Sequence, residues 1–190
     1  MALAGPWNLR FPLKLGAPAQ VNLPKLISWT DHPDEGVQHF SGTATYALTF
    51  TVPAEACQPG IRAMLDLGQV QVIAEPTLNG TALGTLWKPP FRIDVTDCLK
   101  AGTNVLRVQV TNLWPNRLIG DEAKPDYREW RGSSLKSWPP DALNGTPPPD
   151  TGRVTWTTWK HYNVGDPLLP SGLLGPVRLR FARVLAVPDR

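Results

Sequence analysis

The chain has 190 residues, of which 42% are hydrophobic, so it can bury the core of one sizeable domain but is short for two. Its 19 basic and 16 acidic residues leave a formal charge of +3, and the basic residues are scattered singly, a pattern that argues against nucleic acid as a partner. Residues 1–16 have no sustained apolar stretch, so we expect neither a signal peptide nor a membrane span there, and no membrane partner. A secreted or periplasmic parent protein would carry its signal outside this chain, and the compartment stays open.

The chain is rich in proline, glycine and tryptophan. Its 21 prolines and 16 glycines predict many turns and short elements, with no helix longer than a turn or two. Tryptophan combines a large apolar face with one N–H donor, so the eight tryptophans suit both a core and a sugar-stacking surface. We expect five or more of them to pack in the core or at its rim. The spacing of Cys57 and Cys98 requires no disulfide and fits no zinc motif, so we expect free, partly buried thiols.

Alternation of apolar and polar residues predicts a series of short strands. Residues 1–40 show little periodicity and are expected to form an entry segment with one or two edge strands. The dipeptide Asn79-Gly80 predicts a type I′ hairpin turn, because both residues accept a positive φ. Period-two patterns predict further strands at 46–52, 61–67, 70–78, 82–87, 91–95, 106–110 and 177–181.

Residues 115–150 interrupt this pattern, with no period-two run and seven prolines. A loop of this length in a compact domain is usually functional or disordered, and its two tryptophans, Trp130 and Trp138, argue against full disorder. Regular patterning returns at 152–162. On a strand there, Trp156 and Trp159 would face opposite sides, so we expect one of them to lie in the core.

Eight or nine short strands with frequent turns predict an all-β sandwich. The expected organisation is a single domain over residues 1–190, with a long loop insertion at about 113–150.

The run "LNGTALGTLWKPPFRIDVTDCLKAGTNVLRVQVTN" resembles the sugar-binding jelly-roll domain of family 2 glycoside hydrolases. In it, Gly84 is expected to let the backbone approach closely, and Asp94 and Thr96 to cap the turn before Leu99. Five phrases in order, "KLISWTDHPDEGVQHFSGTATY", "DLGQVQVIAEPTLNG", "LWKPPFRIDVTD", "VTNLWPNRLIGDE" and "DPLLPSGLLGPVRL", are similar to the C-terminal domain of family 106 α-L-rhamnosidase-type enzymes over about residues 5–182.

This resemblance implies a galactose-binding-like jelly roll without catalytic residues, whose parent enzyme carries its catalytic carboxylates on a separate barrel domain. It also implies that the loop after the "VTN" strand can reach into the barrel's active site. The long tryptophan-rich insertion departs from the family 2 pattern. A structural calcium ion, which such sandwiches often carry, would be held by carboxylates and carbonyls, with Asp31, Asp34 or Asp166 as candidates; no other cofactor is expected.

Sugar binding needs a flat apolar face together with planar hydrogen-bonding groups, and the insertion offers both. The sugar-binding candidates are Trp114, Asn116, Arg117, Asp121, Glu122, Tyr127, Trp130, Trp159 and His161. The alternative for three of them is structural: Arg117 and Asp121 would form an ion pair that fixes the long loop, with Trp114 as a lid on the core. Trp87 could lie at an exposed loop tip, but a packed strand end fixed by Pro89-Pro90 is the favoured interpretation.

Three functions follow. The first is a non-catalytic accessory domain of a rhamnosidase-like hydrolase that binds carbohydrate through loop aromatics. The second is a structural domain that packs on a catalytic barrel and completes its active site. The third, a small free-standing glycoside hydrolase, lacks support because no pair of carboxylates shows the separation that glycoside hydrolysis needs, and neighbours such as Asp121 and Glu122 would diverge on an extended chain.

Overall fold

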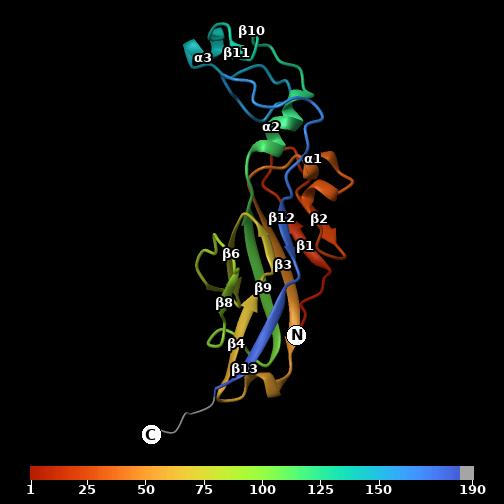
Figure 1. Cartoon of the computed structure of the whole chain (residues 1–190), viewed down its shortest axis with the longest axis vertical. Helices are drawn as coiled ribbons and strands as arrows, with labels where there is room; N and C mark the ends of the chain where they lie inside the picture. The colour runs from red at the N-terminus through yellow and green to blue at the C-terminus, as the bar shows by residue number, and fades with distance from the viewer. Residues whose placement is uncertain (185–190) are drawn as a thin grey trace.

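The computed structural model describes residues 1–184 and builds them mainly from antiparallel β-strands. One layer is a six-stranded sheet in the order β2-β1-β3-β9-β6-β7 (Figure 1). Its strands are β1 (Trp7–Arg10), β2 (Gln20–Leu23), β3 (Thr43–Val52), β6 (Ile73–Leu78), β7 (Thr81–Ala82) and β9 (Gly102–Thr111).

The opposite layer consists of a three-stranded sheet, in the order β13-β4-β8, and the strand pair β12-β5. Its strands are β4 (Ile61–Asp66), β5 (Gln69–Gln71), β8 (Arg92–Asp94), β12 (Gly172–Gly175) and β13 (Arg178–Arg183). Side chains from both layers join one hydrophobic core. The all-β sandwich predicted from the sequence is therefore confirmed, while the finer galactose-binding-like jelly-roll assignment stays a prediction.

The two longest strands, β3 and β9, lie at the centre of the large sheet. They pair along their whole length, from Thr43 opposite Thr111 to Val52 opposite Gly102. Alternate residues point inward, as period-two alternation requires, so that Tyr46 is buried between exposed or half-buried neighbours. The strands predicted at 46–52 and 106–110 are confirmed, and each is longer than its apolar pattern indicated.

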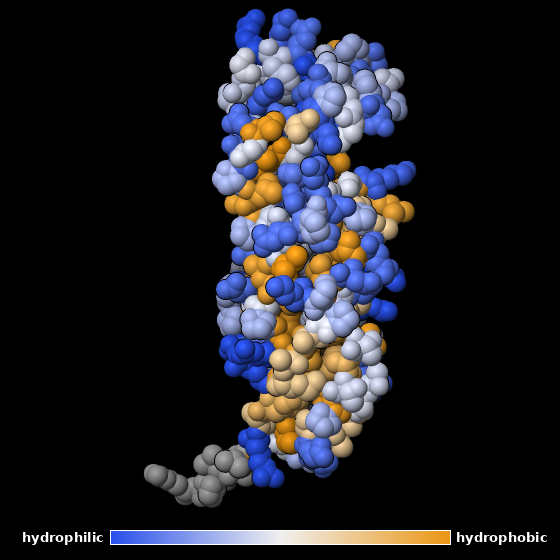
Figure 2. All heavy atoms as spheres, turned by 90° about the vertical axis from the view of Figure 1, so that its right-hand side faces the viewer, coloured by the Kyte–Doolittle hydropathy of each residue, from blue (hydrophilic) through white to orange (hydrophobic). Residues whose placement is uncertain are grey.

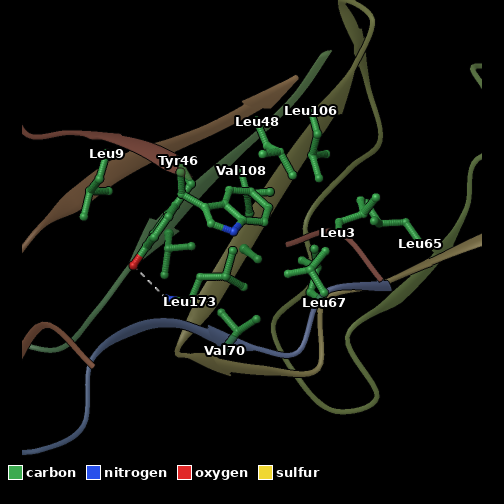
Figure 3. Packing of buried hydrophobic residues seen from close by; sticks show 14 of the residues in the cluster. Leu3, Leu9, Tyr46, Leu48, Leu65, Leu67, Val70, Leu106, Val108 and Leu173 are labelled. Atoms are coloured by element: carbon green, nitrogen blue, oxygen red, sulfur yellow. Dashed lines mark hydrogen bonds between the residues drawn. The ribbon is translucent and has the colours of Figure 1, made fainter. Parts of the chain in front are cut away.

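The core fills the space between the two layers (Figure 3). Side chains of the large sheet meet side chains that come from the opposite layer and from the segments that flank it. The labelled residues in this view are Leu3, Leu9, Tyr46, Leu48, Leu65, Leu67, Val70, Leu106, Val108 and Leu173.

Tyr46 links the two layers by hydrogen bonds as well as by packing. Its hydroxyl accepts hydrogen bonds from Trp29 Nε1 (2.6 Å) and from the backbone N of Leu173 (3.0 Å), the latter drawn in Figure 3. Burial raises the pKa of the Tyr46 hydroxyl well above its usual value, and these hydrogen bonds offset only part of that effect. Gly172 has a φ of +96°, and a Cβ there would lie 2.6 Å from both Trp29 Nε1 and the Tyr46 hydroxyl. Only glycine fits this position.

The Asn79-Gly80 turn is confirmed, with φ values of +52° and +89° between β6 and β7. Asn79 also donates a hydrogen bond from Nδ2 to Oδ1 of the buried Asn104 (2.7 Å), which fixes the turn to the start of β9. Gly84 is required for its φ of +95° and not for close packing, because a Cβ there would meet no atom within 4 Å. The predicted close approach at Gly84 is therefore wrong.

The entry segment has one edge strand, β2, within the predicted one or two, and its other strand, β1, lies between β2 and β3. Two other strand predictions are corrected by the structure. The strand predicted at 70–78 is divided into β5 and β6. The strand predicted at 82–87 is limited to β7 and an isolated bridge between Ala74 and Leu86, so the segment pairs with β6 only in part.

Helices are short. They are η1 (Trp29–Asp31), α1 (Glu35–Gln38), η2 (Ala54–Cys57), α2 (Pro115–Glu122) and α3 (Pro140–Asn144). None of those in residues 1–184 is long and apolar enough to cross a membrane. The loop predicted from residue 115 begins instead as α2, with Pro115 at its first turn, where proline's fixed φ favours a helix start.

The molecule is elongated, and everything between α2 and the return to β12 projects from one end of the sandwich (Figure 1). We call residues 123–163 the lobe. It contains α3 and a small hairpin of β10 (Trp130–Arg131) and β11 (Ser134–Leu135).

Candidate functional site

Helix α2 attaches the lobe to the sandwich through buried polar side chains. Asn116 Nδ2 donates to the Leu169 carbonyl (2.8 Å) and to Ser171 Oγ (3.0 Å), and Asn116 Oδ1 accepts from Leu169 N (2.8 Å). The side chain therefore joins α2 to the segment that leads back into β12. With these bonds made and the residue 1% exposed, Asn116 is placed to hold the backbone and not to meet a ligand.

Arg117 and Asp121 form a buried ion pair, with 3.0 Å between Arg117 Nη2 and Asp121 Oδ1. Asp121 is fully buried, and its Oδ2 also accepts hydrogen bonds from Val154 N (2.9 Å), Thr155 N (2.7 Å) and Thr155 Oγ1 (2.7 Å). The geometry matches the structural alternative, in which this pair fixes the insertion. Trp114 is 54% exposed, so its suggested role as a lid on the core is wrong.

The strand predicted at 152–162 is absent, although an isolated bridge joins Trp159 to Ser134. The reason lies in the partners of its backbone. The N–H groups of Val154 and Thr155 donate to the Asp121 carboxylate, and the Thr157 carbonyl accepts from Arg128 Nη1 (2.8 Å). Side chains thus occupy the groups that a neighbouring strand would have bound.

The lobe is held together by charged hydrogen bonds rather than by a hydrophobic core. Among its residues Pro139 is the only buried apolar one, whereas Arg128 is only 6% exposed. Arg153 Nη2 binds Glu122 Oε1 (2.6 Å) and its Nη1 donates to the Lys124 carbonyl (3.1 Å). On the face shown in Figure 2, the lobe is mostly hydrophilic, while hydrophobic residues gather in patches along the sandwich.

Asp126 is the centre of this polar framework. Its carboxylate accepts from Arg128 Nε (2.8 Å), Arg128 Nη2 (2.9 Å), the Arg128 backbone N (3.1 Å) and Trp130 Nε1 (3.0 Å). Burial by itself would raise the pKa of the Asp126 carboxyl, but the hydrogen bonds from Arg128 and Trp130 outweigh it and lower the pKa to about 2.

We expect the lobe to loosen on acidification. The folded pKa of Asp126, about 2, lies below the unfolded value of about 3.9, so its stabilisation is fully present above about pH 4 and is lost as the pH falls through about 2. Hydrogen exchange of lobe amides between pH 5 and pH 2, corrected for intrinsic rates, measures the loss. Asp126→Asn should already show weaker protection at pH 5. An identical pH profile in the wild type and in Asp126→Asn would contradict the assignment.

Aromatic rings and cations alternate along one side of the lobe. Lys160 Nζ lies 5.1 Å from the centre of the Trp130 ring, and Arg128 Cζ lies over both Trp130 (5.0 Å) and Trp156 (5.7 Å). Trp156 in turn stacks on Trp138, with 5.5 Å between ring centres and 18° between planes. We call Trp138 and Trp156 the aromatic pair. Their rings are 56% and 41% exposed, so the pair offers a flat apolar surface held in place from one side.

The other predicted site residues lie around this framework. Tyr127 donates its hydroxyl to Asp141 Oδ2 (2.8 Å), and Trp159 is exposed beside the β10–β11 hairpin. His161 is exposed and lies 6.5 Å, ring to ring, from Tyr162. The structure thus places the lobe residues apart from the buried set on α2.

Trp138 was missed by sequence reasoning. The available signal was its position before Pro139 and Pro140, which keep the backbone out of a sheet and leave the ring at the surface.

Tryptophan burial differs from the expectation. Only Trp7 and Trp29 are buried, Trp130 is half-buried, and the exposed tryptophans are Trp87, Trp114, Trp138, Trp156 and Trp159. The core and its rim therefore take fewer tryptophans than predicted, and neither tryptophan of the 156/159 pair lies in the core. Trp87 is 65% exposed beneath Lys88 Nζ (5.2 Å), so the packed strand end is also wrong. Cys57 and Cys98 are free and half-buried, as expected.

The candidate calcium ligands are not gathered in one place. No group of three or more histidine, cysteine, aspartate or glutamate side chains in residues 1–184 is arranged to hold a metal ion. Asp34 caps α1 by accepting from Val37 N (3.1 Å), and Asp166 accepts from Asn163 N (2.8 Å). These aspartates do not fit a shared calcium site, and calcium binding elsewhere in the chain stays a prediction.

Comparison with known proteins finds that the chain is similar to one part of several glycoside hydrolases. No family model matches it. It is 50% identical over 177 residues to a "Putative beta-glucuronidase" of Formosa agariphila, covering 93% of this chain and 15% of that protein. A rhamnosidase from Novosphingobium sp. PP1Y superposes with a TM-score of 0.77 at 35% identity, covering 96% of this chain and 15% of that one.

A beta-glucuronidase from an uncultured Clostridium sp. superposes less closely, with a TM-score of 0.52 at 26% identity over 60% of this chain. The chain spans about 15% of the length of the first two relatives. It is a β-sandwich domain associated with glycoside hydrolases, found in these relatives as a small part of a much longer protein.

Proposed function

We propose that the chain is a non-catalytic carbohydrate-binding accessory domain of a rhamnosidase-type glycoside hydrolase, related to family 106. The observation that carries the proposal is the aromatic pair. Trp138 and Trp156 are exposed on a lobe without a hydrophobic core of its own, so their rings contribute little to folding. Flat, rigid and exposed aromatic rings suit the C–H face of a sugar ring.

The carboxylates once considered for catalysis support an accessory role. Asp121 is fully buried in its ion pair, and Glu122 is bound to Arg153 at 2.6 Å. Glycoside hydrolysis needs two carboxyl groups that flank the scissile bond, one acting as the acid. Neither of these two is placed for that chemistry.

The test is isothermal titration of the chain with L-rhamnose, D-galactose and pectic oligosaccharides. We expect millimolar or tighter binding to at least one of them, and a loss of roughly tenfold or more, about 1.4 kcal/mol, in Trp138→Ala and in Trp156→Ala. Trp87→Ala is the matched control, because Trp87 is also exposed, at 65%, but lies outside the lobe. If all three variants bind as the wild type does, or if no sugar binds, the aromatic pair is not a sugar site.

A second function is favoured by a different surface, at the start of α2. Leu113, Trp114 and Leu169 are 54%, 54% and 45% exposed, and Leu113 and Leu169 line one hollow of about 150 Å³. Exposed apolar residues next to one another mark contact sites for other domains. Here the chain would pack on the catalytic barrel of its parent enzyme.

This second function predicts that hydrogen exchange of residues 112–118 slows when the chain is measured within a longer protein that includes the barrel. It also predicts weak or absent binding of free sugars by the chain alone. Unchanged exchange in the longer protein would exclude it.

A further inference from the structure

A cavity of about 490 Å³ lies between α1, α2 and the segment 164–168. Its volume is within the range of ligand pockets in proteins, about 300–1,000 Å³. Buried residues of α2 form its floor, namely Arg117, Ile119 and Gly120. The cavity is separate from the aromatic pair, because neither Trp138 nor Trp156 lines it.

The floor contains an arginine with unused hydrogen-bond donors. The Arg117 side chain is 6% exposed, and only its Nη2 is paired, with Asp121. Its buried Nε has no hydrogen-bond partner within residues 1–184, and no hydrogen bond from its Nη1 is formed with them. A guanidinium has five N–H donors, and buried polar groups in native proteins are almost always satisfied. A partner that enters the cavity would accept from Nη1, whereas the buried Nε stays out of its reach.

Glycines keep the wall beside this guanidinium free of side chains. A Cβ on Gly16, whose φ is +86°, would lie 2.8 Å from Arg117 Nη1. A Cβ on Gly36 would lie 2.0 Å from the Gly16 carbonyl oxygen, so neither glycine can be replaced without moving the wall. The Gly16 backbone thus packs directly against Nη1, with no side chain between this segment and the guanidinium.

The rim supplies further hydrogen-bonding groups and some apolar surface. Glu35 on α1 and Lys124 after α2 are exposed and reach the cavity with side chains that make no hydrogen bond within residues 1–184. Asp166 adds a second carboxylate acceptor to that of Glu35 at the rim of the cavity. Val164 and Leu168 lie beside them, and Val164 is 66% exposed. Donors, acceptors and small apolar patches together match a ligand with several hydroxyl groups.

The charges favour a neutral ligand over an anionic one. Among the lining residues, Arg117 and Lys124 carry two positive charges and Glu35 and Asp166 carry two negative ones. The charge of Arg117 is in addition offset by Asp121, with which it is paired outside the lining. The cavity therefore has no excess of positive charge that would attract an anion. A ligand carboxylate would meet two rim carboxylates, whereas hydroxyl groups can accept from the guanidinium and donate to the acids.

We propose that this cavity binds one neutral monosaccharide unit, with Arg117 donating to its hydroxyl oxygens and Glu35 accepting from its hydroxyl groups. The inference rests on the proposed carbohydrate-binding function but not on the aromatic pair. It assigns a second sugar site, at the junction of the lobe and the sandwich.

The test is an NMR titration of the ¹⁵N-labelled chain with L-rhamnose as the neutral probe and D-glucuronate as the anionic probe. We expect L-rhamnose to shift the amide signals of Gly16, Gly36, Gly120 and Gly165, and D-glucuronate to bind more weakly. Glu35→Gln and Lys124→Ala should each weaken L-rhamnose binding roughly fivefold, because the first makes a hydrogen bond to a charged acceptor a neutral one and the second removes a charged donor. Glu55→Gln and Lys25→Ala are matched controls, since both residues are exposed and lie outside the cavity.

The outcomes separate the two sites. Shifts at these glycines that persist in Trp138→Ala support the cavity even if the aromatic pair fails. Sugar binding that is lost in Trp138→Ala but unchanged in Glu35→Gln and Lys124→Ala overturns the cavity and leaves the proposed function intact. Absence of shifts at these glycines, or binding of D-glucuronate as tight as that of L-rhamnose, overturns the proposal of a neutral sugar site. Unchanged melting temperatures of the variants show that folding is not the cause.

Discussion

Replacing Asp121 with alanine is expected to lower the free energy of unfolding by about 3–5 kcal/mol, because it leaves the buried Arg117 charge without its partner. The substitution also removes the acceptor of three hydrogen bonds from Val154 and Thr155. Since small domains are stable by only about 5–15 kcal/mol, much of the stability would be lost. The segment that runs back from the lobe to the sandwich should come free first.

Urea unfolding and hydrogen exchange measure this effect. We expect a lower midpoint and a large loss of protection at residues 151–158. Asp97→Ala is the matched control, because Asp97 is exposed and its side chain makes no hydrogen bond within the described chain, so a change within about 0.5 kcal/mol is expected. Equal effects of the two substitutions would show that the ion pair does not hold the insertion in place.

Trp29→Ala is expected to cost a similar amount, about 3–5 kcal/mol, for a different reason. The Trp29 ring is 1% exposed and packs against Phe11 and Phe40, with 5.7 Å and 5.4 Å between ring centres. Its removal leaves a cavity in a close-packed core and takes away one of the two hydrogen bonds that the Tyr46 hydroxyl accepts.

The measurement is again urea unfolding, with Trp87→Ala as the control of the same chemistry at an exposed position. Trp29→Phe should recover part of the loss, because it refills the cavity without restoring the hydrogen bond. A loss for Trp87→Ala as large as that for Trp29→Ala would mean that burial does not set the contribution of these tryptophans.

The residues that stabilise the fold are different from the residues proposed to bind sugar. The sandwich takes its stability from the hydrophobic core between its layers, and the lobe takes its own from buried ion pairs. The aromatic pair and the rim of the cavity belong to neither set, so their residues can be substituted without unfolding the chain. This separation is what makes the binding tests interpretable.

Several features of the fold could be predicted from the sequence because they depend on neighbouring residues along the chain. Alternation alone located the central strands β3 and β9, since a strand with one buried face needs an apolar residue at every second position. Asn79-Gly80 located its hairpin, because few other dipeptides accept two positive φ values. Strands and turns of this kind were sufficient to predict an all-β sandwich.

The site was predicted only in outline. The sequence placed its candidate aromatics in the insertion and in the segment after it, but it could not separate Asn116, Arg117 and Asp121, which are buried and bonded, from the exposed Trp138 and Trp156. Polar and aromatic residues of these types can either stabilise a fold or bind a ligand. Whether a given side chain is buried or exposed depends on which distant segments of the chain pack against it.

The sequence by itself determined the sandwich, its central strands and its hairpin, because local periodicity and turn chemistry encode them. Only the tertiary structure decided the rest. Residues 154–157 have a strand-like pattern but form no strand, because their backbone groups bind Asp121 and Arg128, which are distant in the sequence. The cavity beside Arg117 likewise exists only because α1, α2 and the segment 164–168 meet there, and no local pattern records that meeting.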